Sequence, residues 1–93
     1  MKAEKKKRQI AILGSTGSIG TQALQVIDEH SDLYEVYCLT ANNQVELLAQ
    51  QAIRFKPAAV VIANEQHYER LCSLLANEPD IKVYAGAKAL EEI

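Results

Sequence analysis

Several features that mark specialised classes of protein are scarce in this sequence of 93 residues. It has two cysteines, two prolines, four glycines and 5% aromatic residues. Cys38 and Cys72 are isolated from each other, which fits neither a disulfide scaffold nor the short spacings of metal and redox motifs, so we expect buried free thiols. The few glycines exclude collagen, and a hydrophobic content of 48% argues against disorder. We therefore expect one small globular domain.

Long hydrophobic runs are also missing. The first apolar run covers only residues 10–13 and ends at Gly14, whereas a membrane-spanning helix needs about 20 apolar residues. The sequence therefore predicts neither a signal peptide nor a membrane span.

Charge is divided unequally along the chain. Ten Lys and Arg stand against 12 Asp and Glu, but five of the ten basic residues lie at the start: Lys2, Lys5, Lys6, Lys7 and Arg8. From residue 9 onward the balance is about −6, five basic residues against eleven acidic ones. A basic terminus can contact phosphates or anionic lipid, but a solvated leader is the simpler interpretation, and the acidic body argues against nucleic-acid binding. We predict a disordered basic leader at residues 1–8 and a folded domain at residues 9–93.

Apolar residues alternate between short continuous runs and helical spacing, which is typical of a parallel sheet with crossover helices. The runs predict strands at residues 10–13, 36–41, 58–63 and 81–85. Helical spacing predicts three apolar faces: Ile19, Ala23, Val26 and Ile27; Val45, Leu48, Ala49, Ala52 and Ile53; and Tyr68, Leu71, Cys72 and Leu75. Asn64 is suited to cap the third helix, and residues 87–93 are typical of the beginning of a fourth.

This order predicts an α/β fold, a Rossmann-type three-layer sandwich with a parallel sheet, truncated after about four strands. With right-handed crossovers, we expect the first strand at the centre of the sheet and the fourth strand on the opposite side of it from the second. Since a helix begins at the end with no strand after it, we expect the chain to be part of a longer protein.

A glycine-rich loop separates the first predicted strand from the first helix. Glycine recurs at every third position, at Gly14, Gly17 and Gly20. Such glycines allow a tight turn, a close approach of phosphate to backbone amides and close packing of helix on strand. The helix N-terminus points free N–H groups at the same place, and Thr16 and Ser18 add hydroxyl donors. The loop departs from G-x-G-x-x-G by one residue, yet its strand-loop-helix context predicts a pyrophosphate site rather than a plain turn.

The end of the second strand indicates which dinucleotide is bound. An NAD site usually places a carboxylate there for the ribose hydroxyls, but residues 40–44 are Thr, Ala, Asn, Asn and Gln. With no carboxylate to repel a 2′-phosphate, and amides that can donate to it, the sequence favours NADP over NAD. In a second, compatible interpretation Asn42 and Asn43 form the turn and Asn43 caps the next helix.

No catalytic set is apparent elsewhere: neither a Ser-His-Asp arrangement nor a metal-ligand spacing is present. The chain is therefore predicted to bind a nucleotide and to have no catalytic residues, no metal ligands and no turnover of its own.

Three segments resemble one family, that of 1-deoxy-D-xylulose 5-phosphate reductoisomerase. The residues that carry the resemblance are ILGSTGSIGTQALQVI, then LTANNQVELLAQQAIRFKP, and then AAVVIANEQHYERL. The heptad GSTGSIG is its most specific part, and the resemblance covers most of the chain after the leader. One departure is that the family commonly has Gly-Lys-Asn where this chain has Asn42, Asn43 and Gln44. The missing lysine would be the natural cation for a 2′-phosphate.

The resemblance implies an NADPH-dependent oxidoreductase that isomerises and reduces deoxyxylulose phosphate to 2-C-methyl-D-erythritol 4-phosphate in non-mevalonate isoprenoid biosynthesis. It implies a cytoplasmic bacterial homodimer that uses Mg²⁺ or Mn²⁺, with the metal ligands and the sugar-phosphate site beyond residue 93. The cofactor-binding residues that it implies are Thr16, Gly17, Ser18 and Ile19 at the phosphates, and Asn42, Asn43 and Gln44 near the adenosine.

Two other kinds of protein also fit the pattern. One is the NADP-binding domain of another reductase, such as an aspartate-semialdehyde or N-acetylglutamyl-phosphate reductase, although these families normally carry Ala in place of Ser15. The other is a stand-alone nucleotide-sensing domain that regulates a partner.

Overall fold

The computed structural model describes residues 7–86 and 88–89, which form one sheet with helices packed on it. The elements in chain order are β1 (Arg8–Ile12), α1 (Ser18–Glu29), β2 (Tyr34–Ala41), α2 (Val45–Phe55), β3 (Ala59–Ile62), the 3-10 turn η1 (Glu65–His67), α3 (Tyr68–Leu74) and β4 (Lys82–Ala85). The predicted α/β fold with four parallel strands is confirmed.

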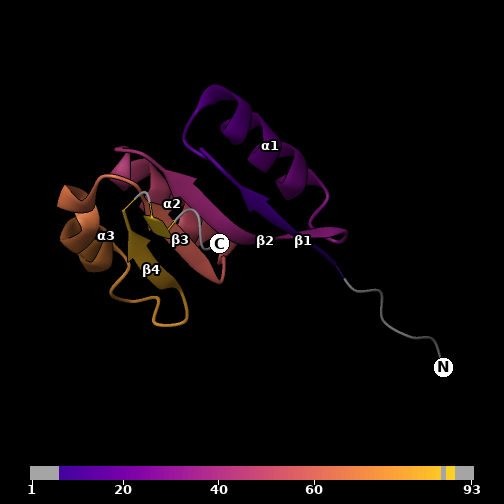
Figure 1. Cartoon of the computed structure of the whole chain (residues 1–93). Helices are drawn as coiled ribbons and strands as arrows, with labels where there is room; N and C mark the ends of the chain where they lie inside the picture. The colour runs from indigo at the N-terminus through magenta and orange to yellow at the C-terminus, as the bar shows by residue number, and fades with distance from the viewer. Residues whose placement is uncertain (1–6, 87, 90–93) are drawn as a thin grey trace.

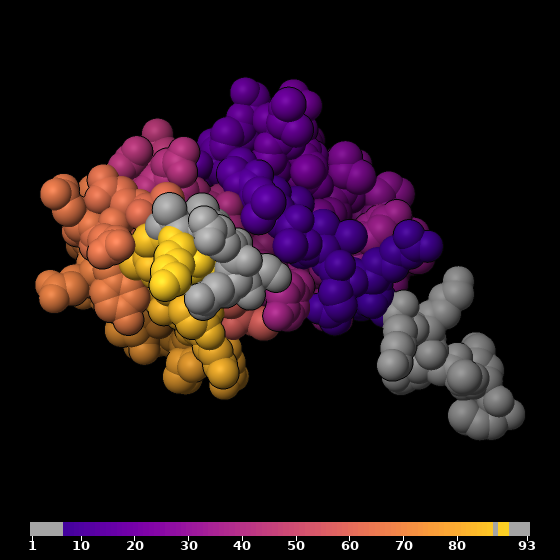
Figure 2. Space-filling model, in the orientation of Figure 1, coloured from indigo at the N-terminus to yellow at the C-terminus, as the bar shows by residue number. Residues whose placement is uncertain are grey.

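The strand order corrects the predicted topology. The sheet runs β1-β2-β3-β4, so β4 lies beside β3 and not on the far side of β1 (Figure 1). The side chains of all three helices pack into one core cluster, and right-handed crossovers that keep their helices on one face must step across the sheet in one direction. In the described part of the chain, β1 and β4 are therefore the two edges, and the α1–β1 and α3–β4 parts occupy opposite ends of the molecule (Figure 2).

The core lies between the sheet and the helices. Leu39 of β2, Leu48 of α2 and Leu71 of α3 are fully buried in it, and each contributes about 1.5–3 kcal/mol by leaving water. Alternate side chains of β4 also face this core: Val83 and Ala85 pack against it, as the sequence predicted.

The buried face of α1 agrees only in part with the predicted one, since Ile27 is buried and Ala23 packs against the core as predicted, but the other two residues do not. Ile19 and Val26 are 83% and 52% exposed, and the buried residues are Gly20, Leu24 and Ile27. The spacing 20, 24, 27 is as helical as the predicted one, but a glycine adds nothing to a hydrophobic pattern. Gly20 is on the buried face because the helix meets the preceding loop there, and this turns Ile19 outward.

The other two helices follow the sequence more closely. In α2 four of the five predicted residues, Val45, Leu48, Ala49 and Ala52, are buried, whereas the fifth, Ile53, is 45% exposed. In the third helical segment Leu71 and Leu75 are buried and Tyr68 is 40% exposed. Asn64 caps the 3-10 turn η1 that leads into α3, where its side chain accepts a hydrogen bond from the N–H of Gln66 at 3.0 Å. The prediction that Asn64 caps α3 itself is wrong, because the N-cap of α3 is His67.

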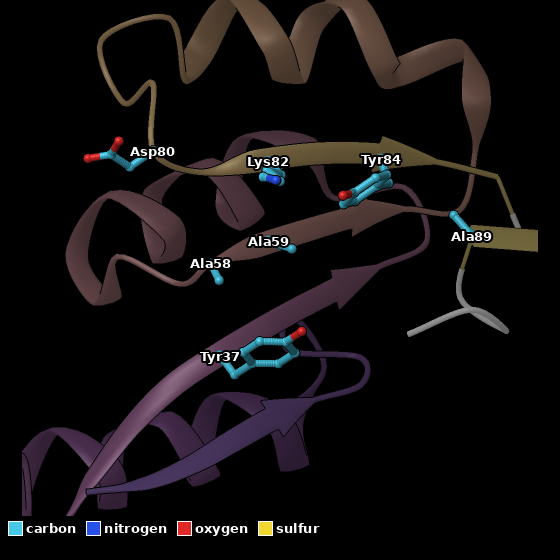
Figure 3. Close-up of a pocket in the computed structure, with 7 residues that line it drawn as sticks. All are labelled: Tyr37, Ala58, Ala59, Asp80, Lys82, Tyr84 and Ala89. Atoms are coloured by element: carbon cyan, nitrogen blue, oxygen red, sulfur yellow. The ribbon is translucent and has the colours of Figure 1, made fainter. Parts of the chain in front are cut away.

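The second face of the sheet carries a smaller cluster of Cys38, Ala59 and Val61, against which Ala89 packs. Beside it lies an open hollow of about 440 Å³. Tyr37 of β2 and Tyr84 of β4 project into this hollow on either side of Ala58 and Ala59 (Figure 3). Lys82 lies between Asp80 and Tyr84 on the β4 side of the hollow. Lys88 and Ala89 have helical backbone; the rest of the predicted fourth helix lies outside the described residues.

Both cysteines are free thiols, as predicted, but only Cys38 is buried, and Cys72 is partly exposed. Residues 1–6 of the predicted leader are outside the described residues, and Arg8 is the first residue of β1. Within the described part of the chain, no helix combines the length and the apolar character that crossing a membrane requires.

Candidate nucleotide-binding site

The loop between β1 and α1 is a tight turn at the carboxyl end of the sheet. Gly14 has φ +74°, a left-handed conformation that costs other residues about 1–2 kcal/mol. The turn is closed by the N–H of Gly17, which donates to the carbonyl oxygen of Gly14 at 3.1 Å. Position 14 therefore requires glycine because of its backbone conformation. Lack of space is not the reason, since a Cβ there would meet nothing within 4 Å.

Gly20 is required for the opposite reason. A Cβ at this position would lie 2.3 Å from the carbonyl oxygen of Gly14 and 2.7 Å from the Cα of Ser15. The first turn of α1 thus rests directly on the loop backbone, and only a residue without a side chain fits. The sequence assigned the third glycine to close packing of the helix on the strand, and the structure places this close approach against the loop that follows the strand.

Several loop amides are left free to bind an anion. The N–H groups of Gly14, Ser15 and Gly17 donate to Thr40 Oγ1, to the Thr40 carbonyl and to the Gly14 carbonyl. The described residues provide no acceptor for the backbone N–H of Thr16, Ser18 or Ile19. These groups lie at the positive end of a twelve-residue helix that has no acidic residue in its first turn and no side-chain cap at Gly17. The arrangement suits a phosphate group.

The turn after β2 is neutral and is tied to the turn after β3. Asn64 donates its backbone N–H to the Asn42 carbonyl at 3.0 Å, and its side-chain amide donates to Asn43 Oδ1 at 2.7 Å. The alternative role of Asn43 as a helix cap is wrong: Gln44 is the N-cap of α2, and no side chain caps it. Asn42, Asn43 and Gln44 are all exposed, and they lie at the carboxyl end of the sheet, as the glycine loop does.

Sequence reasoning missed one buried polar group at this site. Gln51 of α2 is 8% exposed and Ser15 is fully buried, and their side chains bond to each other 36 positions apart in the chain. A glutamine at the edge of an apolar helical face is usually solvated. The only sequence signal that Gln51 is buried was therefore its place beside that face. Because the buried amide and hydroxyl both find partners, the described residues contain no buried side-chain polar atom without a hydrogen bond.

The titratable groups with shifted pKa values lie away from the loop. Burial raises the pKa of the Cys38 thiol on the second face of the sheet. A hydrogen bond with Cys72 is the main cause that raises the pKa of Tyr68 on α3, followed by the charge of Cys72 and then desolvation. No group of three or more potential metal ligands occurs among the described residues.

The family model of 1-deoxy-D-xylulose 5-phosphate reductoisomerase matches residues 10–93. This chain belongs to that family. The resemblance inferred from the glycine loop and the two following segments is thereby confirmed.

Curated members of the reductoisomerase family are closely similar in sequence. The reductoisomerase of Phocaeicola vulgatus is 69% identical over 87 residues, which are 94% of this chain and 22% of the relative. That of Porphyromonas gingivalis is 55% identical over 86 residues, 92% of this chain and 22% of the relative. The chain thus spans less than a quarter of the length of these reductoisomerases.

Solved reductoisomerase structures have the same fold in the matching region. The enzyme of Zymomonas mobilis in complex with NADPH matches with a TM-score of 0.89 and 40% identity, over 94% of this chain and 23% of that one. A reductoisomerase in complex with NADPH, fosmidomycin and magnesium matches with a TM-score of 0.85 and 31% identity, over 92% of this chain and 21% of that one. This region of the reductoisomerase fold is therefore the four-stranded unit described above.

Proposed function

We propose that this chain is the NADPH-binding part of a 1-deoxy-D-xylulose 5-phosphate reductoisomerase. The observation that carries the proposal is the set of unpaired N–H groups of Thr16, Ser18 and Ile19 at the N-terminus of α1. They lie in a fold similar to that of a reductoisomerase bound to NADPH. The proposal extends to the binding residues predicted from sequence: Thr16, Gly17, Ser18 and Ile19 at the phosphates, and Asn42, Asn43 and Gln44 near the adenosine.

The residues present fit the charge of NADPH. The pyrophosphate would receive hydrogen bonds from backbone N–H groups and from the hydroxyls of Thr16 and Ser18. Gly17 contributes its lack of a side chain, because its own N–H is already bonded to Gly14. At the adenosine end, the exposed amides of Asn42, Asn43 and Gln44 replace the carboxylate of an NAD site.

The parent protein would supply the rest of the enzyme. Its proposed reaction is the isomerisation and reduction of deoxyxylulose phosphate to 2-C-methyl-D-erythritol 4-phosphate for isoprenoid biosynthesis, as a cytoplasmic homodimer. Mg²⁺ or Mn²⁺ would be bound by residues of the parent outside this chain. The chain alone is expected to bind NADPH and to show no turnover of deoxyxylulose phosphate.

Calorimetric titration of the folded chain with NADPH, NADH and ATP tests the proposal. We expect NADPH to bind at least about tenfold more tightly than NADH, a difference of about 1.4 kcal/mol for the 2′-phosphate. ATP shares only the adenosine and part of the phosphates, so it should bind more weakly than NADPH. A folded chain that bound none of the three would overturn the proposal for this chain.

Replacing Asn43 by aspartate should weaken NADPH binding by about tenfold or more and change NADH binding by less than about threefold. The carboxylate still accepts the hydrogen bond that Asn64 gives to Asn43 Oδ1, so the turn is preserved and only a negative charge is added. That charge repels a 2′-phosphate but can accept hydrogen bonds from ribose hydroxyls. Equal losses for the two nucleotides, measured by the same calorimetry, would remove Asn43 from the 2′-phosphate site.

A further inference from the structure

We propose that Gln51 of α2 is a positioning residue for the nucleotide site, and that it acts through the peptide between Ser15 and Thr16. The inference rests on the proposed function, because it explains how the phosphate-binding amide of Thr16 is aimed. Gln51 lies on a different element from the loop and follows the adenosine turn by only seven residues.

The contact between Gln51 and Ser15 is reciprocal. Ser15 Oγ donates to Gln51 Oε1 at 2.6 Å, and Gln51 Nε2 donates to the Ser15 carbonyl oxygen at 2.9 Å. Two buried hydrogen bonds to one residue define both its side chain and its backbone orientation. A buried amide that lost these partners would leave unsatisfied polar atoms, so the arrangement has no low-energy alternative inside the core.

The second of these bonds orients the peptide that follows Ser15. A trans peptide directs its C=O and N–H groups in opposite directions, and no peptide bond in the described residues is cis. When the Ser15 carbonyl points at Gln51, the N–H of Thr16 must point away from α2. That N–H has no acceptor among the described residues and belongs to a half-buried residue, so it faces the place where a phosphate would lie.

The same network reaches the adenosine end of the site. The backbone N–H of Ser15 donates to the Thr40 carbonyl at 2.8 Å, and the N–H of Gly14 donates to Thr40 Oγ1 at 2.9 Å. Thr40 stands two residues before Asn42, and α2 begins directly after Gln44. Helix α2 thus starts at the adenosine turn and holds the phosphate loop through Gln51. The helix therefore sets the distance between the two halves of the site.

Two variants and one matched control test this role. Gln51→Leu removes both hydrogen bonds between Gln51 and Ser15. Ser15→Ala removes the contacts of the hydroxyl with Gln51 Oε1 and with the Thr40 carbonyl oxygen, and it keeps the bond from Gln51 Nε2 to the Ser15 carbonyl. Gln50→Leu is the control, because Gln50 precedes Gln51 on the same helix and is exposed. The Kd of NADPH is measured for each variant by calorimetry. Urea unfolding at the same temperature first shows that the variant is folded.

We expect Gln51→Leu to raise the Kd of NADPH by about 10- to 100-fold, which corresponds to one misaligned hydrogen bond to a charged group. Ser15→Ala should have a smaller effect in the same direction, and Gln50→Leu should change the Kd by less than about twofold. A Kd that does not change in folded Gln51→Leu would overturn the proposal. If Gln51→Leu does not fold, the Kd of Gln51→Met decides, because methionine also lacks the amide that donates to the Ser15 carbonyl.

Hydrogen exchange without nucleotide separates local positioning from general stability. Gln51→Leu should accelerate hydrogen exchange at the N–H of Ser15 and, by a smaller factor, in the central strand β3. Equal acceleration at both places would mean that Gln51 acts only on global stability, and the positioning role would be wrong. Failure of the unchanged chain to bind NADPH would count against the proposed function, whereas this exchange measurement would still decide whether Gln51 holds the loop.

Discussion

Replacing Gly17 by aspartate is expected to raise the Kd of NADPH by at least about 100-fold and to leave the folded chain as stable as before, or slightly more stable. Loss of binding and gain of stability have different causes at this one position. Calorimetry measures the first and urea unfolding measures the second.

The stability half of this prediction comes from helix capping. Gly17 is the N-cap of α1, with φ −80° and ψ 173°, a conformation that any residue adopts. A Cβ there would lie 3.5 Å from the Gly14 carbonyl oxygen, an ordinary contact. Aspartate is among the best N-cap residues because its carboxylate accepts from the free N–H groups of the first turn, and it exceeds glycine by a few tenths of a kcal/mol.

The binding half comes from electrostatics. The carboxylate would occupy the free amides and place a negative charge where the pyrophosphate is proposed to bind. Two unit charges about 4 Å apart repel by about 4 kcal/mol at an effective dielectric constant near 20. Gly17→Asn is the matched control, because asparagine caps equally well and carries no charge. If Gly17→Asp bound NADPH as tightly as Gly17→Asn, phosphates could not lie at this helix end.

Replacing Gly20 by alanine is expected to lower the free energy of unfolding by about 2–4 kcal/mol, although alanine is the better helix former by about 1 kcal/mol. The added methyl group would overlap the Gly14 carbonyl and the Ser15 backbone, at 2.3 and 2.7 Å. Neither can retreat without breaking the hydrogen bonds of Ser15 to Thr40 and Gln51. Urea unfolding followed by circular dichroism measures the change.

Gly17→Ala is the control for this second prediction. It adds the same methyl group three residues earlier, where the distance of 3.5 Å to the Gly14 carbonyl oxygen leaves room for it. We expect its unfolding free energy to lie within about 1 kcal/mol of that of the unchanged chain. A Gly20→Ala chain as stable as Gly17→Ala would show that α1 does not rest on the loop as described.

The local periods predicted the elements well, because each depends on neighbours in the chain. The β3 run is buried throughout, and Leu48, Ala49 and Ala52 face the core at helical spacing. The predicted sheet order was wrong, because a right-handed crossover allows β4 on either side of the sheet. The observed order depends on where α3 packs, and Leu71 places α3 in the same core as α2.

The site was predictable where it depends on the backbone and unpredictable where it depends on distant side chains. Gly14 and Gly20 could be assigned from spacing, because a turn and a close approach need glycine at fixed offsets. Gln51 could not, since its partner Ser15 is 36 positions away and nothing in a periodic pattern distinguishes a paired buried amide from a solvated one. The face of α1 was predicted only in part for a related reason: Gly20 lets the helix pack on the loop because it has no side chain, and a hydrophobic pattern does not register a glycine.

The central claim is that NADPH binds with its phosphates at the N-terminus of α1 and its adenosine at the turn after β2. An amide-resolved NMR titration of the chain with NADPH tests it most directly. We predict that the largest shifts occur at the N–H groups of Thr16, Ser18 and Ile19 and at the side-chain amide of Asn43, with little change at Tyr84 beside the hollow on the second face. Shifts that centred on that hollow and left the loop unchanged would contradict the account.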